Sequence, residues 1–231
     1  MITVETIRER HSVREYDGGP LDQAEFDALG AVVEECARES GLDIQLVGDN
    51  PEVFNVIARF GLIRGCRTHV AFVVDDAKAG DVGEDEAIGY WGQKIVLAAQ
   101  DMGLNTCWCA LCSRKKSRAV VAPGKKIRLI IAVGHGKTQG FTRKTKSVEA
   151  LSSVECAKGP AWFAEAMEAA QLAPTAMNNQ NFKITLLSDG KTVCIDAPQS
   201  GLNVIDEGIV RCNFEIAANE AGADWRWERD I

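Results

Sequence analysis

Apolar residues return every three or four positions in several stretches of the chain, which is the spacing of one helix face. In residues 22–39 they fall at Phe26, Leu29, Val33 and Cys36, after Pro20 and before a glycine, so this stretch is predicted to be a helix. Comparable patterns predict further helices over residues 51–64, 83–103 and 160–174.

Other apolar runs are continuous and flanked by turn residues, which is typical of buried strands. The clearest are residues 69–76 and 125–136, and shorter strands are predicted within 43–50, 104–111 and 181–190. Residues 135–158 are polar, basic and irregular and predict a long loop. Because strands and helices alternate, the class is α/β or α+β.

The second half of the chain repeats the pattern of the first. Shifted by 119 positions without gaps, residues 87–108 and 206–227 share five identical pairs: Gly89 and Gly208, Ala98 and Ala217, Ala99 and Ala218, Gly103 and Gly222, and Trp108 and Trp227. The order of the predicted elements around them also agrees. We therefore expect one domain over residues 1–231, built from related halves at about 1–145 and 155–231 that mimic a dimer within one chain.

Composition narrows the function classes. The net charge of −7 argues against nucleic-acid binding, which needs a basic face. The chain lacks an apolar run of about 18 residues and a signal peptide, so we expect a cytoplasmic protein away from the membrane. Its eight cysteines are then expected to be reduced. Cys107, Cys109 and Cys112 are interpreted as buried side chains at a strand end, with a metal or redox site as the alternative.

A cationic cluster, "RERHSVREY", lies at residues 8–16 of this acidic chain. Arg10, Ser12 and Arg14 alternate by two, so an extended backbone would direct them to one side. Arginine forks and a hydroxyl suit a phosphate, which favours an anion site. A solvated helix end is the alternative interpretation.

A second polar cluster, "APTAMNNQNF", follows the helix predicted at 160–174. Pro174 ends the helix, and the amides of Asn178, Asn179 and Gln180 then precede a strand. These amides suit a flat heteroaromatic ligand, with a polar turn as the alternative interpretation.

Several common chemistries are disfavoured. "GHGKTQG" lacks the first glycine of a phosphate-binding loop because Ile131 stands there, and no G-x-G-x-x-G unit follows a strand. The three histidines, His11, His69 and His135, are scattered, and a G-x-S-x-G nucleophile elbow is absent.

Taken together, the motifs resemble those of the FMN-dependent nitroreductase family. "RERHSVREY" resembles its R-x-S-x-R signature, and "AAQLAPTAMNNQNFKI" resembles its A-P-S-x-x-N-x-Q-P-W segment. "YWGQKIVLAAQDMGLNTCWCAL" resembles its long helix, and "IRLIIAVGHG" with "TRKTKS" resembles its late strand and basic tail. The resemblance implies an α+β nitroreductase-like fold.

The chain departs from the usual family pattern in the order of its motifs. The A-P-S-x-x-N-like segment comes far after the arginine signature instead of soon after it, which resembles the branch in which one chain mimics the dimer. Thr175, Asn181 and Phe182 replace the usual Ser, Pro and Trp, which leaves the substrate preference open.

The resemblance assigns roles to both clusters. Arg10 and Ser12, with His11 between them, would hold the FMN phosphate and ribityl chain, and Arg14 would lie near N1 and O2 of the ring. Further residues are implied as follows: Arg64 near the ring, Arg143 and Lys144 near the phosphate, backbone amides of Cys109, Ala110 and Leu111 facing N5, and Pro174, Thr175, Ala176 and Asn178 approaching the ring from the other half.

The implied function is an FMN-dependent oxidoreductase without a metal. NADH or NADPH would reduce the flavin, and a small-molecule oxidant such as a nitroaromatic or a quinone would reoxidise it by a ping-pong mechanism. The protein itself would supply no catalytic acid or base. Two alternatives stay open, a flavin-binding or sensor protein without turnover and a cysteine-based redox or metal protein.

Overall fold

The computed structural model describes residues 2–54, 63–154 and 159–229 and divides the chain into two compact units. The four-strand unit contains residues 9–79 and 94–142, and the three-strand unit contains residues 1–8, 80–93 and 143–231. The first residues of helix α3 (Val82–Asp101) belong to the three-strand unit and its last residues to the four-strand unit. The predicted halves at about 1–145 and 155–231 stay a prediction.

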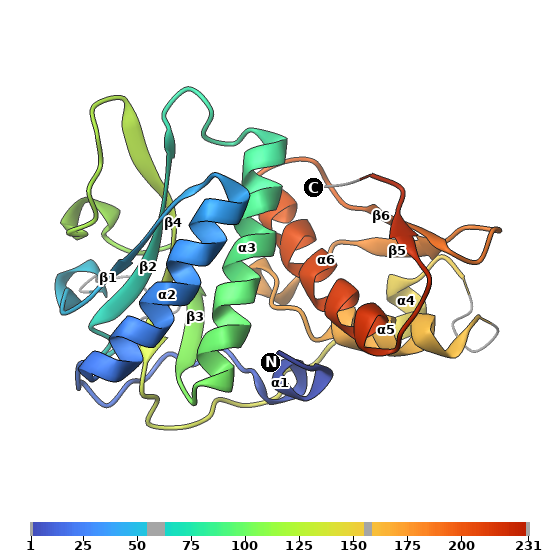
Figure 1. Ribbon diagram of the computed structural model, residues 1–231, viewed down its shortest axis with the longest axis horizontal. Helices are drawn as coiled ribbons and strands as arrows, with labels where there is room; N and C mark the ends of the chain where they lie inside the picture. Colours follow the sequence, from blue (N-terminus) through green and yellow to red (C-terminus); the bar gives the residue numbers. More distant parts are fainter. Residues whose placement is uncertain (1, 55–62, 155–158, 230–231) are drawn as a thin grey trace. The chain divides into compact units, whose positions relative to one another are not determined.

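The four-strand unit is built on an antiparallel sheet with the order β1-β2-β4-β3 (Figure 1). Its strands are β1 (Asp43–Val47), β2 (Thr68–Asp75), β3 (Asn105–Cys109) and β4 (Lys125–Gly134). β2 and β4 are the central strands, and every residue of β2 except the last is buried. The two continuous apolar runs of the sequence are therefore the centre of this sheet, as their lack of alternation predicts.

Helix α2 (Gln23–Ser40) packs beside this sheet (Figure 1). It begins with a capping box, because Asp22 Oδ1 accepts the Glu25 amide at 2.8 Å and Glu25 Oε2 accepts the Asp22 amide at 2.9 Å. It ends at Gly41, whose φ of 72° is left-handed. The prediction of a helix over residues 22–39 is confirmed.

One hydrophobic cluster of this unit joins the N-terminal segment to the sheet. Val13 and Tyr16 are buried in it together with Cys107 and Cys109 of β3 and Ile130 of β4. The interpretation of these two cysteines as buried side chains at the end of a strand is thus confirmed.

The three-strand unit combines packed helices with a small sheet. Helix α5 (Ala161–Gln171) packs against α6 (Leu202–Glu220). The sheet has the order β5-β6-β7, formed by β5 (Lys183–Leu186), β6 (Thr192–Asp196) and β7 (Arg226–Trp227). Shorter helices of the chain include α1 (Val4–Glu9), η1 (Pro51–Phe54), η2 (Arg114–Lys116), α4 (Val148–Leu151) and η4 (Ala176–Asn178).

Within this unit α3 and α6 touch through their backbones at Gly89 and Gly208. A Cβ on Gly89 would lie 2.0 Å from the Ile205 carbonyl oxygen, and a Cβ on Gly208 would lie 2.0 Å from the Glu86 carbonyl oxygen. The 119-residue shift maps Gly89 onto Gly208 and Glu86 onto Ile205. The contact is therefore reciprocal, as in an interface between two related elements around a two-fold axis.

The ends of α3 and α6 match in the same register. The Leu104 amide donates to the Ala99 carbonyl at 2.8 Å, and the Ala223 amide donates to the Ala218 carbonyl at 3.1 Å. The glycine before each donor has a positive φ, 79° and 66° respectively. Both helices thus end in the same glycine-based cap, and the shift of 119 residues relates the two sets of atoms.

Some predicted elements differ from the structure. The helix expected over residues 51–64 is a 3₁₀ turn at 51–54, residues 55–62 lie outside the described chain, and Arg64 forms a bridge with Glu15. The loop expected over residues 135–158 contains α4, and its residues 155–158 are not described. The strands β6 and β7 are not among the predicted elements, and β7 is only two residues long.

The class is α+β, with an antiparallel sheet in one unit and a mixed sheet in the other. In the described residues, none of the helices is long and apolar enough to cross a membrane.

Candidate functional site

The extended segment at residues 10–17 is fixed to the four-strand unit by backbone hydrogen bonds. The Val13 amide donates to the Thr106 carbonyl of β3 at 3.0 Å, and the Tyr16 amide donates to the Arg64 carbonyl at 2.8 Å. Val13 and Tyr16 are also buried in the hydrophobic cluster. The backbone beneath the arginine signature is therefore held at several points.

The end of β4 supplies a second set of attachments. The Asp17 amide donates to the His135 carbonyl, and the Lys137 amide donates to the Glu15 carbonyl, both at 2.9 Å. Gly136 lies between them, and a Cβ there would come within 2.8 Å of Val13 Cγ1. Glycine is thus needed for this close approach of the two segments.

Arg10 carries its charge in a buried position. The residue is 8% exposed, and burial lowers the pKa of its guanidinium to about 10, with the Cys107 thiol beside it. A cation that has lost its water is stabilised by a neighbouring anion, since the anion replaces the lost solvation. The position therefore fits the phosphate that the sequence predicts.

Ser12, Arg14 and His11 complete this part of the site. Arg14 Nη1 donates to the Ser12 carbonyl at 3.5 Å, which places the half-buried Arg14 side chain close to Ser12. His11 Nδ1 lies 2.9 Å from the Glu9 carbonyl oxygen, and His11 Nε2 lies 3.5 Å from Thr142 Oγ1. The cationic cluster at residues 8–16, for which the sequence allows a solvated helix end or an anion site, is thus partly buried.

Arg64 lies beside the same segment, although its side chain is exposed. Its amide donates to the Arg14 carbonyl at 2.8 Å, and its Nη1 lies 3.4 Å from Glu15 Oε1. Their side chains are 69% and 57% exposed, so this ion pair contributes little to stability.

The end of β3 forms a bend in the same unit. Cys109 is the last residue of the strand, and the Leu111 side chain two positions later is 68% exposed. Arg114 Nη2 donates to the Ala110 carbonyl at 2.8 Å, which holds the bend in shape.

The loop after α5 has an unusual backbone. Met177, Asn178 and Gln180 have positive φ angles of 54°, 57° and 47°. Each costs about 1 kcal/mol or more for a residue with a side chain, so the loop needs compensating contacts.

Side chains of the three-strand unit provide these contacts. Both carboxylate oxygens of Asp206 accept the Ala176 amide at 2.9 Å, and Thr175 Oγ1 accepts the Gln180 amide at 3.0 Å. Pro174, Thr175, Ala176 and Asn178, predicted as site residues, all lie in this braced loop.

The loop amides also bind the basic tail of the same unit. Asn178 Nδ2 donates to the Lys144 carbonyl at 2.8 Å, and Gln180 Oε1 accepts the Lys146 amide at 2.7 Å. The side chains of Arg143 and Lys144 remain exposed. Some of the side-chain amide groups that the sequence assigns to a ligand therefore bind the backbone of this tail instead.

The structure thus places the predicted site residues in two groups. The four-strand unit contains Arg10, His11, Ser12, Arg14, Arg64, Cys109, Ala110 and Leu111, and the three-strand unit contains Arg143, Lys144, Pro174, Thr175, Ala176 and Asn178.

Sequence reasoning missed Asp206. The residue is 9% exposed, and burial raises the pKa of its carboxyl to about 7, although the hydrogen bond from the Ala176 amide acts in the opposite direction. In the sequence it precedes a helical pattern and resembles an ordinary acidic helix start. The helix begins earlier, at Leu202, so Asp206 lies in its second turn.

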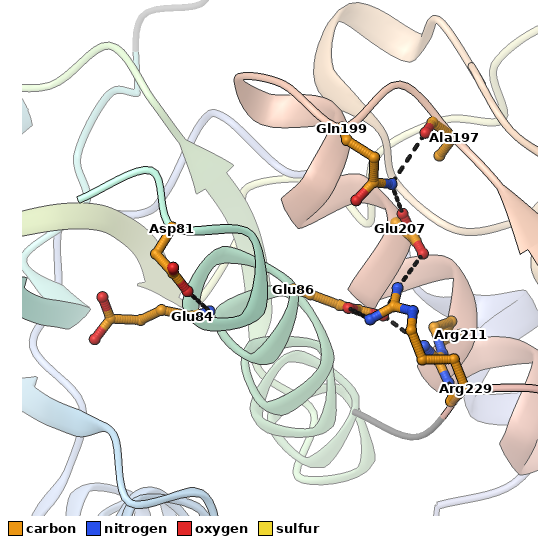
Figure 2. A network of polar contacts seen from close by, with 8 residues as sticks. All are labelled: Asp81, Glu84, Glu86, Ala197, Gln199, Glu207, Arg211 and Arg229. Atoms are coloured by element: carbon orange, nitrogen blue, oxygen red, sulfur yellow. Dashed lines mark hydrogen bonds and ion pairs between the residues drawn. The ribbon is translucent and has the colours of Figure 1, made fainter. Parts of the chain in front are cut away.

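A buried ion-pair network lies in the same unit (Figure 2). Glu86 and Arg211 are each 1% exposed and pair at 2.5 Å, while Arg229 contacts Glu86 at 2.7 Å and Glu207 at 3.0 Å. Gln199 Nε2 donates to Glu207 at 2.7 Å. Glu84 and Asp85 occupy the first turn of α3, whereas Glu86 forms the buried ion pairs of this network.

His69 also has a structural position. It is fully buried, its Nε2 lies 2.8 Å from Ser117 Oγ, and burial lowers its pKa to about 4. The seven cysteines of the described chain are present as thiols.

Comparisons with known proteins agree with the fold. A family model described as "Putative TM nitroreductase" matches residues 2–218. The "putative nitroreductase" of Thermotoga maritima is similar in structure, with a TM-score of 0.67 and 21% identity over 100% of this chain and 90% of that chain.

Two further solved structures each cover 66% of this chain and 95% of their own. One is a "putative nitroreductase in complex with FMN" from Desulfovibrio desulfuricans, with a TM-score of 0.51 and 18% identity. The other is a "putative NADH dehydrogenase/NAD(P)H nitroreductase" from Parabacteroides distasonis, with a TM-score of 0.50 and 21% identity. No curated protein matches the chain in sequence.

These findings define the fold as that of the nitroreductases, a class of oxidoreductases. Since the family model covers most of its length, the chain belongs to this nitroreductase family. The resemblance drawn from the sequence motifs is confirmed.

Proposed function

We propose that the protein is an FMN-dependent oxidoreductase that takes reducing equivalents from NADH or NADPH and delivers them to a small-molecule oxidant such as a nitroaromatic or a quinone. The buried Arg10 on its fixed segment carries the proposal, since this position suits the phosphate of FMN. Family membership supports it, as do the names of the Desulfovibrio and Parabacteroides proteins, which mention FMN and NAD(P)H.

The N-terminal segment would bind the cofactor along its length. Arg10 and Ser12 would hold the phosphate and ribityl chain with His11 beside them, and Arg14 would place its guanidinium at the N1 and O2 edge of the ring. Because a positive charge there stabilises negative charge on the ring, Arg14 would favour the reduced cofactor. Arg64 would add to this charge from its exposed position.

The other predicted residues would orient the ring and phosphate. Backbone amides of Cys109, Ala110 and Leu111 would face N5. The loop from Pro174 through Thr175 and Ala176 to Asn178 would approach from the second half, and Arg143 and Lys144 would reach the phosphate.

When bound, FMN supplies the hydride acceptor and donor atom, so the protein residues position and tune rather than exchange protons. A single face of the ring would serve donor and oxidant in turn, which gives ping-pong kinetics.

We further propose that one chain acts as a pseudo-dimer and works in the cytoplasm. The reciprocal contact of Gly89 with Gly208 and the matched ends of α3 and α6 support an internal duplication. One chain would then complete one flavin site from both halves.

The first experiment is to purify the full chain and titrate it with FMN while recording the visible spectrum and flavin fluorescence. We expect bound flavin that NADH or NADPH bleaches without oxygen and that a nitroaromatic or quinone reoxidises. Arg14→Ala should weaken binding. Arg8→Ala should not, since Arg8 is an exposed arginine paired with Glu5 at 3.3 Å.

Two outcomes would argue for other functions. Absence of any FMN binding would reject the proposal. Bound flavin that neither nicotinamide reduces would favour a flavin-binding or sensor protein without turnover.

A further inference from the structure

Two cysteines separated by two residues, Cys109 and Cys112, lie at the end of β3 and in the bend that follows it. Cys109 is 6% exposed, whereas Cys112 is half-buried at the edge of the same hydrophobic cluster. The Cys112 thiol donates to the Cys109 carbonyl oxygen at 3.6 Å, so the bend turns Cys112 back towards Cys109. The arrangement therefore combines an accessible thiol with a buried one three positions before it.

The two thiols interact directly and differ in acidity. A hydrogen bond from the Cys109 thiol to Cys112 lowers the pKa of Cys112, and the Arg114 guanidinium lowers it further. The pKa of Cys109 lies well above its usual value, mainly because of the same hydrogen bond and secondly because of burial. Cys112 is thus the thiol that ionises first, and Cys109 retains its proton.

Arg114 is fixed at this bend and begins a run of cations. Its Nη2 donates to the Ala110 carbonyl at 2.8 Å, between the two cysteines in sequence. Lys115 and Lys116 follow with exposed side chains. A reactant with negative charge would be attracted to this surface.

We propose that Cys109 and Cys112 form a thiol–disulfide exchange site for anionic low-molecular-weight disulfides, with Cys112 as the attacking thiol and Cys109 as the resolving thiol. The proposal goes beyond the flavin reaction and does not depend on flavin binding.

The exchange proceeds in two displacements. The Cys112 thiolate attacks one sulfur of the disulfide R–S–S–R, so that a Cys112–S–S–R bond forms and R–S⁻ leaves. Cys109 no longer donates to a thiolate, so the main cause of its raised pKa is removed. Cys109 loses its proton to solvent and attacks Cys112 Sγ, and the second R–S⁻ leaves. Two protein thiols are oxidised by two electrons, and one disulfide is reduced to two thiols.

The first test treats the reduced full chain with one equivalent of 5,5′-dithiobis(2-nitrobenzoate), followed by peptide mass mapping. We expect release of both aromatic thiolates and a Cys109–Cys112 disulfide. Cys194 is the matched control, because it is also half-buried while burial raises its pKa. Because a lower pKa leaves a larger fraction of the thiol as thiolate at neutral pH, Cys112 should react faster than Cys194.

Variants separate the two roles. Cys112→Ser should lose the fast phase, Cys109→Ser should keep it but accumulate a stable mixed disulfide on Cys112, and Cys194→Ser should behave as wild type. Arg114→Met should shift the pH profile of the fast phase to higher pH. High salt should slow the reaction of Cys112 with the anionic reagent and speed its reaction with the cationic disulfide cystamine.

Peptide mass mapping of the wild-type chain tests the exchange site even where a variant fails to fold. Modification of Cys194 as fast as Cys112 would overturn the proposal, as would a mixed disulfide on Cys112 that Cys109 never resolves. Because flavin is absent from this assay, its failure would leave the proposed oxidoreductase function unaffected.

Discussion

Replacement of Asp206 by Asn tests whether the buried carboxyl destabilises the protein at neutral pH. Burial raises its pKa from 3.8 to about 7 in the native protein. Between these values the native state holds a proton that the unfolded chain has released. Because the unfolded state then binds fewer protons, the free energy of unfolding falls as the pH rises through this window and stays level above it.

The magnitude follows from the size of the shift. About three pKa units at about 1.4 kcal/mol each give about 4 kcal/mol as an upper bound, since a small local opening would rehydrate the carboxylate. Asn keeps an oxygen that can accept the Ala176 amide, which Asp206 accepts at 2.9 Å, and it cannot ionise. We therefore expect Asp206→Asn to match wild type near pH 4 and to exceed its stability by up to about 4 kcal/mol at pH 8.

Urea unfolding at pH 4, 6 and 8, at equal flavin content, would measure the difference. The fluorescence of Trp162, Trp225 and Trp227, which cluster around Phe214 in the same unit, reports the transition. Asp189→Asn is the control with the opposite sign. Hydrogen bonds from Thr192 lower the pKa of the exposed Asp189 to about 2. Replacement of this carboxylate by an amide should therefore destabilise the protein at pH 8. An equal effect of Asp206→Asn at pH 4 and pH 8 would refute the reasoning.

Three further substitutions test the fold and the proposed site. Gly89→Ala should lower the free energy of unfolding by about 3 kcal/mol in urea titrations, because the new Cβ would lie 2.0 Å from a carbonyl oxygen. Gly83→Ala is the control and should be tolerated, because a Cβ on Gly83 would have no neighbouring atom closer than 3.5 Å. Arg14→Ala should lower the reduction potential of bound FMN in a spectroelectrochemical titration, while Arg8→Ala should leave it unchanged. Gln180→Ala should cost about 2 kcal/mol in thermal or urea unfolding, because it removes two hydrogen bonds of about 1 kcal/mol each, to the Lys146 amide and to the Gln171 carbonyl.

The long elements of the fold could be predicted from the sequence because local pattern and tertiary burial agree in them. The runs at 69–76 and 125–136 have continuous apolar centres, residues 70–74 and 129–133, and they form the central strands β2 and β4. Helix α2 carries its start and stop signals, Asp22 and Gly41, within a few residues of its ends. By contrast, β7 consists of two residues and exists only through its pairing with β6, which sequence periodicity does not encode.

The site shows the same division between local and long-range information. Arg10, Ser12 and Arg14 are identified from local residue types, from their spacing by two and from the resemblance to the R-x-S-x-R signature. The bonds that hold their segment come from Thr106 and Arg64, which are distant in sequence. The raised pKa of a buried carboxyl such as Asp206 likewise depends on packing, so the sequence offered only an acidic residue near a helix start.

The asymmetry between the two halves leads to a prediction about stoichiometry. The helix ends and the glycine contact repeat with the 119-residue shift, but the arginine signature of residues 10–14 has no counterpart in the second half. The braced loop at 174–180, in turn, belongs to the second half. If each half supplies a different part of one site, each chain binds one FMN.

The amount of flavin released by heat from the saturated, purified chain, divided by the protein concentration, should therefore be close to one. Size-exclusion chromatography with light scattering would relate this ratio to the number of chains present. A ratio of two would show that both halves form complete sites, because the second half would then bind FMN without the signature. A ratio of one half, with two chains per particle, would show that the site needs a second copy and would reject the pseudo-dimer.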